Sequence, residues 1–118
     1  MRYLCLVYFE PNIFDKFTPA EGAAFTNESL TYDESLMARG LFVDANALQS
    51  TDQAKTVRVR NGKASVTDGP FAETREVLGG YVMVEAPNID EALKAAAGIP
   101  LARLGSVEVR PILQLGKT

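Results

Sequence analysis

The sequence lacks histidine and tryptophan, and its 118 residues include a single cysteine, Cys5. The absence of histidine excludes Ser-His-Asp and Cys-His catalysis, histidine-ligated haem and zincin-type metal sites. A single cysteine excludes intrachain disulfides and thiolate zinc clusters, so nothing indicates an oxidising compartment. We interpret Cys5 as a small buried side chain within an apolar segment. We therefore expect neither a metal nor another cofactor.

The sequence also lacks a patch of basic residues. Its 12 Lys and Arg side chains are outnumbered by 15 Asp and Glu side chains, which gives a net charge of −3. Nucleic-acid-binding surfaces need clustered cations, whereas the basic residues between Lys55 and Lys63 alternate along a predicted strand. No apolar run approaches the ~20 residues that span a bilayer, and residues 1–9 are too short for a signal peptide. We expect a cytoplasmic protein that binds neither nucleic acid nor a membrane.

Local patterns predict a single domain over residues 1–118. Residues 2–9 are apolar at nearly every position, as in a strand that is covered on both faces. A capping box over residues 18–21 begins a helix, and Gly40 ends it. The side chains that share one face of this helix by spacing are Phe25, Ser29, Tyr32, Leu36 and Met37.

The rest of the chain alternates between strand and helix signals. Asn61-Gly62 between two alternating segments is typical of a type I′ β-hairpin. Further strands are predicted at residues 41–48, 56–60, 64–67, 79–86 and 106–113, and a second helix at 89–97. Pro111 favours an edge position for the last strand.

The element order is β-α-β, an inserted β-hairpin, and β-α-β. This order predicts an α+β, ferredoxin-like split β-α-β fold with two helices on one face of an antiparallel sheet. The other sheet face is then uncovered, although residues 2–9 and 81–86 are apolar on both sides. We expect a homodimer in which two such sheets face each other as a dimeric α+β barrel.

One loop carries a recognisable signature. Residues 68–76 read DGPFAETRE and are followed by Gly79-Gly80-Tyr81, and this pattern resembles the signature of the YCII-related, or DGPF-domain, family. Flanking matches occur at residues 56–60, 90–93 and 107–111. The resemblance extends from residue 1 to residue 111, and it implies the dimeric α+β-barrel fold.

The resemblance implies less about activity, because most members of the family have no assigned function. In bacterial genomes they are often associated with extracytoplasmic-function sigma factors, which implies an accessory role. An enzymatic site suggested for the family combines a histidine with an aspartate. Aligned on Gly40, that histidine corresponds to Ser29, while the aromatic residue that follows it is retained as Tyr32. The family's Gly-Gly-Glu-Ala-Leu segment reads Asp-Ala-Asn-Ala-Leu here, over residues 44–48.

Three parts of the signature loop have two interpretations each. Asp68 is the candidate general base, or it forms an Asx-turn with the backbone two residues on. Phe71 lines a ligand pocket, or it anchors the loop to the core. Glu73 and Arg75 orient a ligand, or they belong to a solvated charge cluster.

Other candidate ligand-binding residues lie outside this loop. Arg58 and Arg110, with Arg60, converge on a small anion, or they form a polar sheet face. Tyr32 and Tyr81 donate hydrogen bonds to a ligand, or they are half-buried core residues with satisfied hydroxyls.

Three functions follow from these residues. The first is a dimeric domain that binds a small molecule or acts as a regulatory accessory. The second is a cofactor-independent enzyme that acts on a small organic substrate with Asp68 as general base. The third, from the resemblance alone, is an accessory protein of an extracytoplasmic-function sigma factor.

Overall fold

A four-stranded antiparallel sheet is the centre of the fold in the computed structural model, which describes residues 1–116. Its strands lie in the order β2 (Phe42–Ala47), β5 (Val77–Glu85), β1 (Arg2–Phe9) and β6 (Ser106–Pro111). Neighbouring strands are antiparallel throughout. This topology confirms the predicted α+β fold with its split β-α-β pattern.

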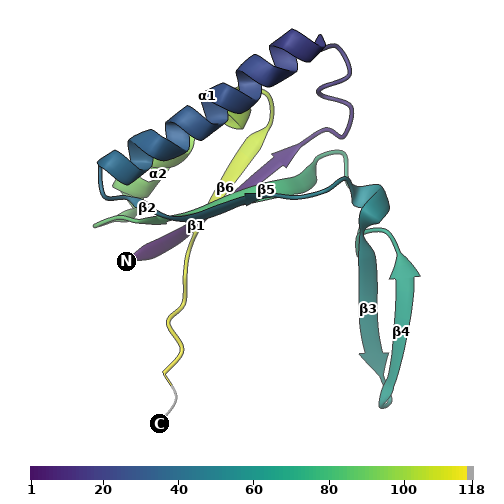
Figure 1. Cartoon of the computed structure of the whole chain (residues 1–118). Helices are drawn as coiled ribbons and strands as arrows, with labels where there is room; N and C mark the ends of the chain where they lie inside the picture. The colour runs from purple at the N-terminus through teal and green to yellow at the C-terminus, as the bar shows by residue number, and fades with distance from the viewer. Residues whose placement is uncertain (117–118) are drawn as a thin grey trace.

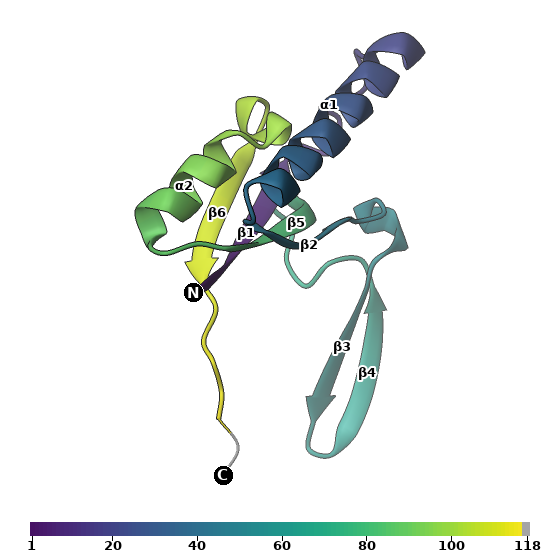
Figure 2. The same ribbon diagram turned by 60° about the vertical axis from the view of Figure 1, so that its left-hand side comes forward.

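Two helices lie on the same face of this sheet (Figures 1 and 2), as predicted. In α1 (Pro19–Ala38), the Thr18 hydroxyl accepts a hydrogen bond from Glu21 N at 3.1 Å and Glu21 Oε1 accepts one from Thr18 N at 3.0 Å. Gly40, at φ +71°, ends α1 in a Schellman motif, since Leu41 N donates to Leu36 O. An asparagine side chain caps the second helix, α2 (Ile89–Ala97). A short 3-10 helix, η2 (Pro100–Arg103), follows it.

Alternation along β1 and β5, with one register shift between Val7 and Tyr8, divides the sheet into two unlike faces. Tyr3, Cys5 and Val7 face the helices and are buried, opposite Val84, Val82 and Gly80 of β5. Leu36 of α1 packs on this layer with no exposed surface. The expectation that Met37 belongs to the same helix face is wrong, because Leu36 takes the inward position and leaves Met37 53% exposed.

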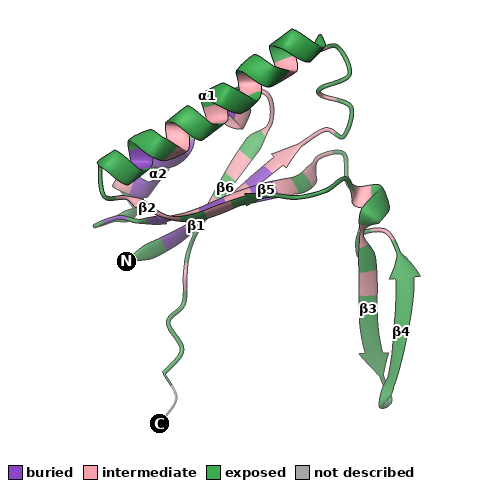
Figure 3. Cartoon of the chain, in the orientation of Figure 1, coloured by how far each residue is buried: buried purple, intermediate pink, exposed green. Residues whose placement is uncertain are grey.

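The opposite face of the sheet, which we call the open face, has an apolar centre. It consists of Leu4, Leu6 and Tyr8 of β1 together with Met83 and Leu78 of β5, which pair with Leu4 and Tyr8. Within residues 1–116 no helix covers this face, and its central residues are half-buried rather than buried (Figure 3). Packing against the helices therefore explains why β1 is apolar on one face, but no contact within residues 1–116 explains why it is apolar on the open face.

The inserted hairpin forms a second, separate sheet of β3 (Lys55–Arg60) and β4 (Lys63–Asp68), which follows the 3-10 turn η1 (Thr51–Gln53). Asn61 at φ 52° and Gly62 at φ 75° make the predicted type I′ turn. The hairpin projects from the body on the side of the open face, as does the chain after β6 (Figure 1). Its valines stay exposed, at 61% for Val57 and 58% for Val59.

Two details refine the predicted elements. β5 begins at Val77 rather than residue 79, because Val77 and Leu78 still pair with the end of β1. β6 ends at Pro111 rather than residue 113, since its partner β1 begins at Arg2, and β6 is an edge strand as its proline predicted. Among residues 1–116 no helix has both the length and the apolar character needed to cross a bilayer.

Candidate functional site

A cavity of about 840 Å³ lies between α1 and the helix-covered face of the sheet, and we call it the α1 cleft. Strands β1, β2 and β5, the loop before α1, α1 itself and the start of η2 all contribute to it. The residues that border the α1 cleft are Val7, Phe9, Phe14, Phe17, Thr18, Pro19, Gly22, Phe25, Thr26, Ser29, Leu30, Tyr32, Asp33, Ala45, Asn46, Ala47, Leu48, Gly79, Gly80, Tyr81, Val82, Ile99, Pro100 and Leu101.

The cleft exists because its floor is built from the smallest side chains. Ala45 pairs with Val82 and Ala47 pairs with Gly80, so these positions face the helices by strand alternation. Larger residues there would fill the space beneath α1. Gly80 is also required by the backbone, because a Cβ at this position would lie 2.7 Å from Asn46 O in the neighbouring strand.

Aromatic rings form one end of the cleft. Phe14 lies edge-on to Phe9, Phe17 and Phe25, with ring centroids 5.4, 5.4 and 5.9 Å apart. Edge-to-face geometry of this kind is favourable beyond simple burial. Gly79 makes room for the cluster, since a Cβ at this position would overlap with the ring of Phe9. The cluster therefore joins β1, the loop before α1 and α1 into one wall.

An ion pair fixes α1 to η2 beside this wall. Arg103 donates from Nη1 and Nη2 to the two carboxylate oxygens of Glu28, at 2.6 and 3.0 Å, and its guanidinium lies 6.0 Å from the ring centroid of Phe25. The hydrogen bonds from Arg103 hold the pKa of Glu28 below its usual range. Bidentate geometry of this type restrains orientation as well as distance.

The polar groups of the cleft come mainly from one face of α1. Ser29, Tyr32 and Asp33 all border it. The Tyr32 hydroxyl donates to Ala95 O of α2 at 2.6 Å, so this group links the two helices. Burial raises the pKa of Asp33 above its usual value.

Tyr81 takes part in a different polar cluster. It borders the cleft, but alternation along β5 directs its side chain to the open face. There its hydroxyl donates to Asp44 Oδ2 at 2.7 Å and accepts from Asn46 Nδ2 at 2.9 Å. These hydrogen bonds connect β5 to the edge strand β2.

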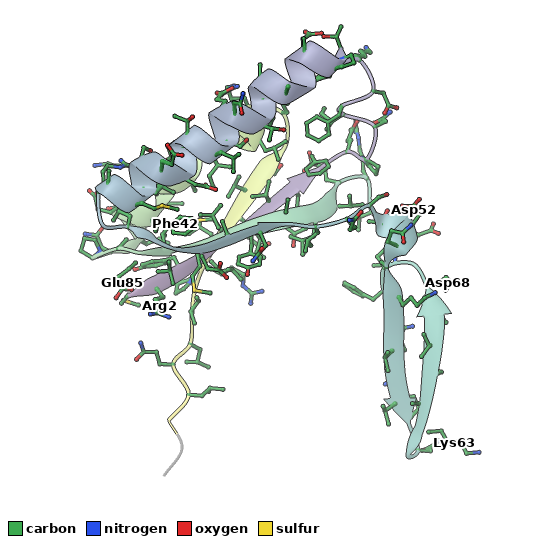
Figure 4. All side chains as sticks on the ribbon, viewed as in Figure 1. Arg2, Phe42, Asp52, Lys63, Asp68 and Glu85 are labelled. Atoms are coloured by element: carbon green, nitrogen blue, oxygen red, sulfur yellow. The ribbon has the colours of Figure 1, made fainter. Side chains whose placement is uncertain are left out.

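The DGPF loop closes the base of the hairpin. Gly69, at φ +93°, donates its N–H to Ala54 O at 2.8 Å, and the Thr56 hydroxyl donates to Gly69 O at 2.8 Å. The positive φ explains the glycine at this position. Asp68 accepts a hydrogen bond from Lys55 Nζ at 2.5 Å, and its side chain is 87% exposed. Figure 4 places Asp68 on the hairpin, away from α1.

The other predicted ligand-binding residues are also spread over the surface. Phe71 is 79% exposed, and its carbonyl accepts a long hydrogen bond, 3.5 Å, from Arg58. Arg75 is paired with Glu10. Glu73 is exposed, and Arg110 lies 3.8 Å from Glu108 at the edge of the open face.

Of the nine predicted site residues, three border the α1 cleft, namely Ser29, Tyr32 and Tyr81. The roles proposed for the other six stay predictions. Sequence reasoning did not single out Asp33 or the aromatic pair Phe14 and Phe17. Two phenylalanines in a short polar loop directly before a helix were the available signal for the pair. The signal for Asp33 was weaker: it lies four residues after Ser29 and three before Leu36, a spacing that places the three residues on one helix face.

Comparison with known proteins agrees with the motif and with the fold. The model of the YCII-related domain matches residues 1–116. The chain is 31% identical over 114 residues to an uncharacterized protein of Rhizobium meliloti (strain 1021), a match that covers 95% of this chain and 92% of the relative. The family match includes every described residue, and the chain therefore belongs to the YCII-related family.

Proposed function

We propose that this protein is a homodimeric domain that binds a small molecule in the α1 cleft. The cleft itself is the observation that supports binding. Its volume, about 840 Å³, lies within the range typical of small-molecule sites. Its walls are aromatic and aliphatic, and a few polar groups on α1 supply orientation. Such a composition suits a ligand with a flat or apolar body of modest size.

The fold accounts for this space without a ligand. Alanine and glycine line the floor, the capping box fixes where α1 begins, and Arg103 with Glu28 fixes α1 against η2. A site that is largely formed before binding loses less conformational entropy when a ligand enters. These restraints favour a ligand-binding role over a cavity that merely results from loose packing.

Binding can be tested with a neutral aromatic probe, 1-naphthalenemethanol, by isothermal titration calorimetry. Ala47→Phe places a ring in the cleft from an exposed position on its floor, so we expect it to weaken binding at least about tenfold. Ala23→Phe on α1 is the matched control, because Ala23 is exposed and does not border the cleft. Equal affinity in Ala47→Phe and the wild type would refute the proposed site.

The second copy is proposed to cover the open face. Leu4, Leu6 and Met83 form an apolar centre there that residues 1–116 leave without a covering layer. The hairpin and the chain after β6 extend on that same side, and they carry exposed apolar residues such as Leu113, at 79%. A two-fold axis through the open face would bury the apolar centre of this face and the exposed apolar residues of the projecting segments together. The reason is that an isologous interface uses the same patch of both copies.

The dimensions of the chain also support a second copy on the open face. The radius of gyration is 16.5 Å, whereas a compact domain of this length has about 13.5 Å. The excess comes from segments that project beyond the sheet rather than from a second core. Segments that project beyond an apolar face can contact a second copy that packs on this face.

Light scattering coupled to size exclusion tests the dimer, with a mass of twice 12.8 kDa as the expected result. Leu6→Lys places a charge at the centre of the open face and should give a monomer. Leu93→Lys is the matched control, because Leu93 is 49% exposed on α2, and it should remain dimeric. A wild-type monomer, or a dimer that persists in Leu6→Lys, would contradict the proposal.

Catalysis with Asp68 as general base is the alternative. Ligand binding is favoured because Asp68 is exposed and paired with Lys55, and it does not border the α1 cleft. A compound that the wild type converts and that Asp68→Asn binds without converting would establish the alternative.

An accessory role beside an extracytoplasmic-function sigma factor is a prediction from family resemblance, and co-purification with such a factor would support it.

A further inference from the structure

We propose that the α1 cleft selects organic cations, that is, molecules with an aromatic or apolar body and a protonated amine that Asp33 binds. This inference rests on the proposed ligand-binding role of the cleft and adds the chemical class of its ligand. Its basis is one carboxylate among apolar and aromatic walls.

Asp33 differs from every other described residue that borders the cleft, because among them it alone has a charged side chain. In the described part of the chain the ion pairs join other partners, such as Arg103 with Glu28, and none includes Asp33. The residue is also partly buried, and it borders the cleft. A carboxylate in such a place lacks a counter-ion, and a ligand ammonium would supply one.

The electrostatics of Asp33 agree with a missing counter-ion. Burial raises its pKa, and no neighbouring cation lowers it again. Glu28, one and a half turns earlier on α1, shows the opposite behaviour, because the hydrogen bonds from Arg103 lower its pKa. The same helix thus carries one paired carboxylate outside the cleft and one carboxylate without a cationic partner at its border.

The remaining walls suit the body of such a cation. Phe14, Phe17 and Phe25 offer aromatic surface for a flat hydrocarbon group and for cation–π attraction. Ser29 lies four residues before Asp33 on the same helix face, so its hydroxyl oxygen can accept a second N–H from the ammonium. An anionic ligand would meet Asp33 with no cationic side chain among the residues that border the cleft.

Three ligands of nearly equal shape test the charge preference on the full chain. They are 1-naphthylmethylamine, which is cationic at neutral pH, neutral 1-naphthalenemethanol and anionic 1-naphthaleneacetate. By calorimetry we expect the wild type to bind the amine about tenfold more tightly than the alcohol, and the acetate most weakly.

Asp33→Asn should remove the preference for the amine while leaving the affinity for the alcohol within about twofold, because the amide keeps the shape of the carboxylate. Glu34→Gln changes the net charge equally on the neighbouring, exposed position of α1, so it should keep the full preference. Circular dichroism and thermal melting confirm that both variants are folded.

The possible results separate the two proposals. Equal affinity of the wild type for the amine and the alcohol overturns the cation selectivity and leaves the binding cleft intact. A preference for the amine that survives in Asp33→Asn also overturns it. Failure of all three ligands to bind overturns the cation selectivity together with the proposed cleft function.

Discussion

Replacing Tyr32 by phenylalanine separates the two interpretations of this residue, a ligand group or a structural link. The substitution removes a hydroxyl that donates to Ala95 O at 2.6 Å and so joins α1 to α2. The ring itself can stay in place beside Gly98, where a Cβ would overlap with the tyrosine hydroxyl. The hydroxyl also accepts a long hydrogen bond, 3.5 Å, from Arg39 Nη2, so the perturbation removes this contact together with the hydrogen bond between the helices.

The expected cost follows from what remains around the acceptor. A hydrogen bond in a protein contributes about 0.5–1.5 kcal/mol net, and more when its loss leaves a buried partner unsatisfied. Ala95 O also accepts from Gly98 N at 3.2 Å, so it keeps one partner in Tyr32→Phe. We therefore expect a loss of about 1 kcal/mol in the free energy of unfolding. For a chain of this length that loss lowers the melting temperature by roughly 3–6 °C.

Differential scanning calorimetry at one fixed protein concentration is the appropriate assay, because the melting temperature of the proposed dimer would depend on concentration. The affinity for 1-naphthalenemethanol should stay within about twofold of the wild type, since the hydroxyl is committed to Ala95. An unchanged melting temperature together with a several-fold loss of affinity would refute this reasoning. It would make the Tyr32 hydroxyl a ligand group.

Three further predictions concern the core and the relation between the two faces of the sheet. Leu36 has no exposed surface, so Leu36→Ala should lower the free energy of unfolding by about 2–5 kcal/mol in urea titrations. Burial raises the pKa of the Cys5 thiol from 9.0 to about 11, so the folded state holds its proton more tightly than the unfolded state does. Stability should therefore be full below pH 9.0 and fall by at most about 3 kcal/mol as the pH rises to about 11, and Cys5→Ala should lose this dependence. The Leu6→Lys monomer should still bind 1-naphthalenemethanol, because a single chain supplies all the residues described around the cleft; loss of binding in a folded monomer would contradict this.

The elements themselves were predictable because their signals are local. The capping box at Thr18, the Asn61-Gly62 turn and the glycine after α1 each fix a backbone conformation within a few residues. The apolar run over residues 2–9 likewise predicted a central strand, although not that only Tyr3, Cys5 and Val7 of it would be buried. Cys5 is fully buried, as its apolar neighbours indicated.

The α1 cleft was not predictable in the same way, because it depends on small side chains rather than on reactive or charged ones. Ala45, Ala47 and Gly80 become the floor of a cavity only once β2 pairs with β5 and α1 crosses above them. Periodicity identifies these positions as inward-facing, but it does not specify the volume left above them. The phenylalanine cluster likewise joins three segments whose contacts exist only in the folded chain.

The DGPF loop presents the opposite difficulty. Its conspicuous motif suggested a catalytic residue at Asp68, whereas the exposed surroundings of this residue give little support for catalysis. Its glycine has a geometric reason, since Gly69 at φ +93° holds together the two ends of the hairpin. Asp68 pairs with Lys55 across the same two strands. A structural requirement at the base of an inserted hairpin is enough to explain both residues.

The alternation of β5 places residues of the α1 cleft and residues of the open face next to one another within one strand. Gly80 and Val82 border the cleft, while Tyr81 and Met83 point to the open face. A change at either face therefore alters one site directly and the other only through the backbone that they share. Because the Tyr81 hydroxyl binds Asp44 and Asn46 of β2, that shared backbone includes the strand that carries Ala45 and Ala47. In the proposed dimer, contacts made by the second copy on the open face would thus restrain the floor of the cleft, and dimerisation would have a physical route to ligand affinity without any shared residue.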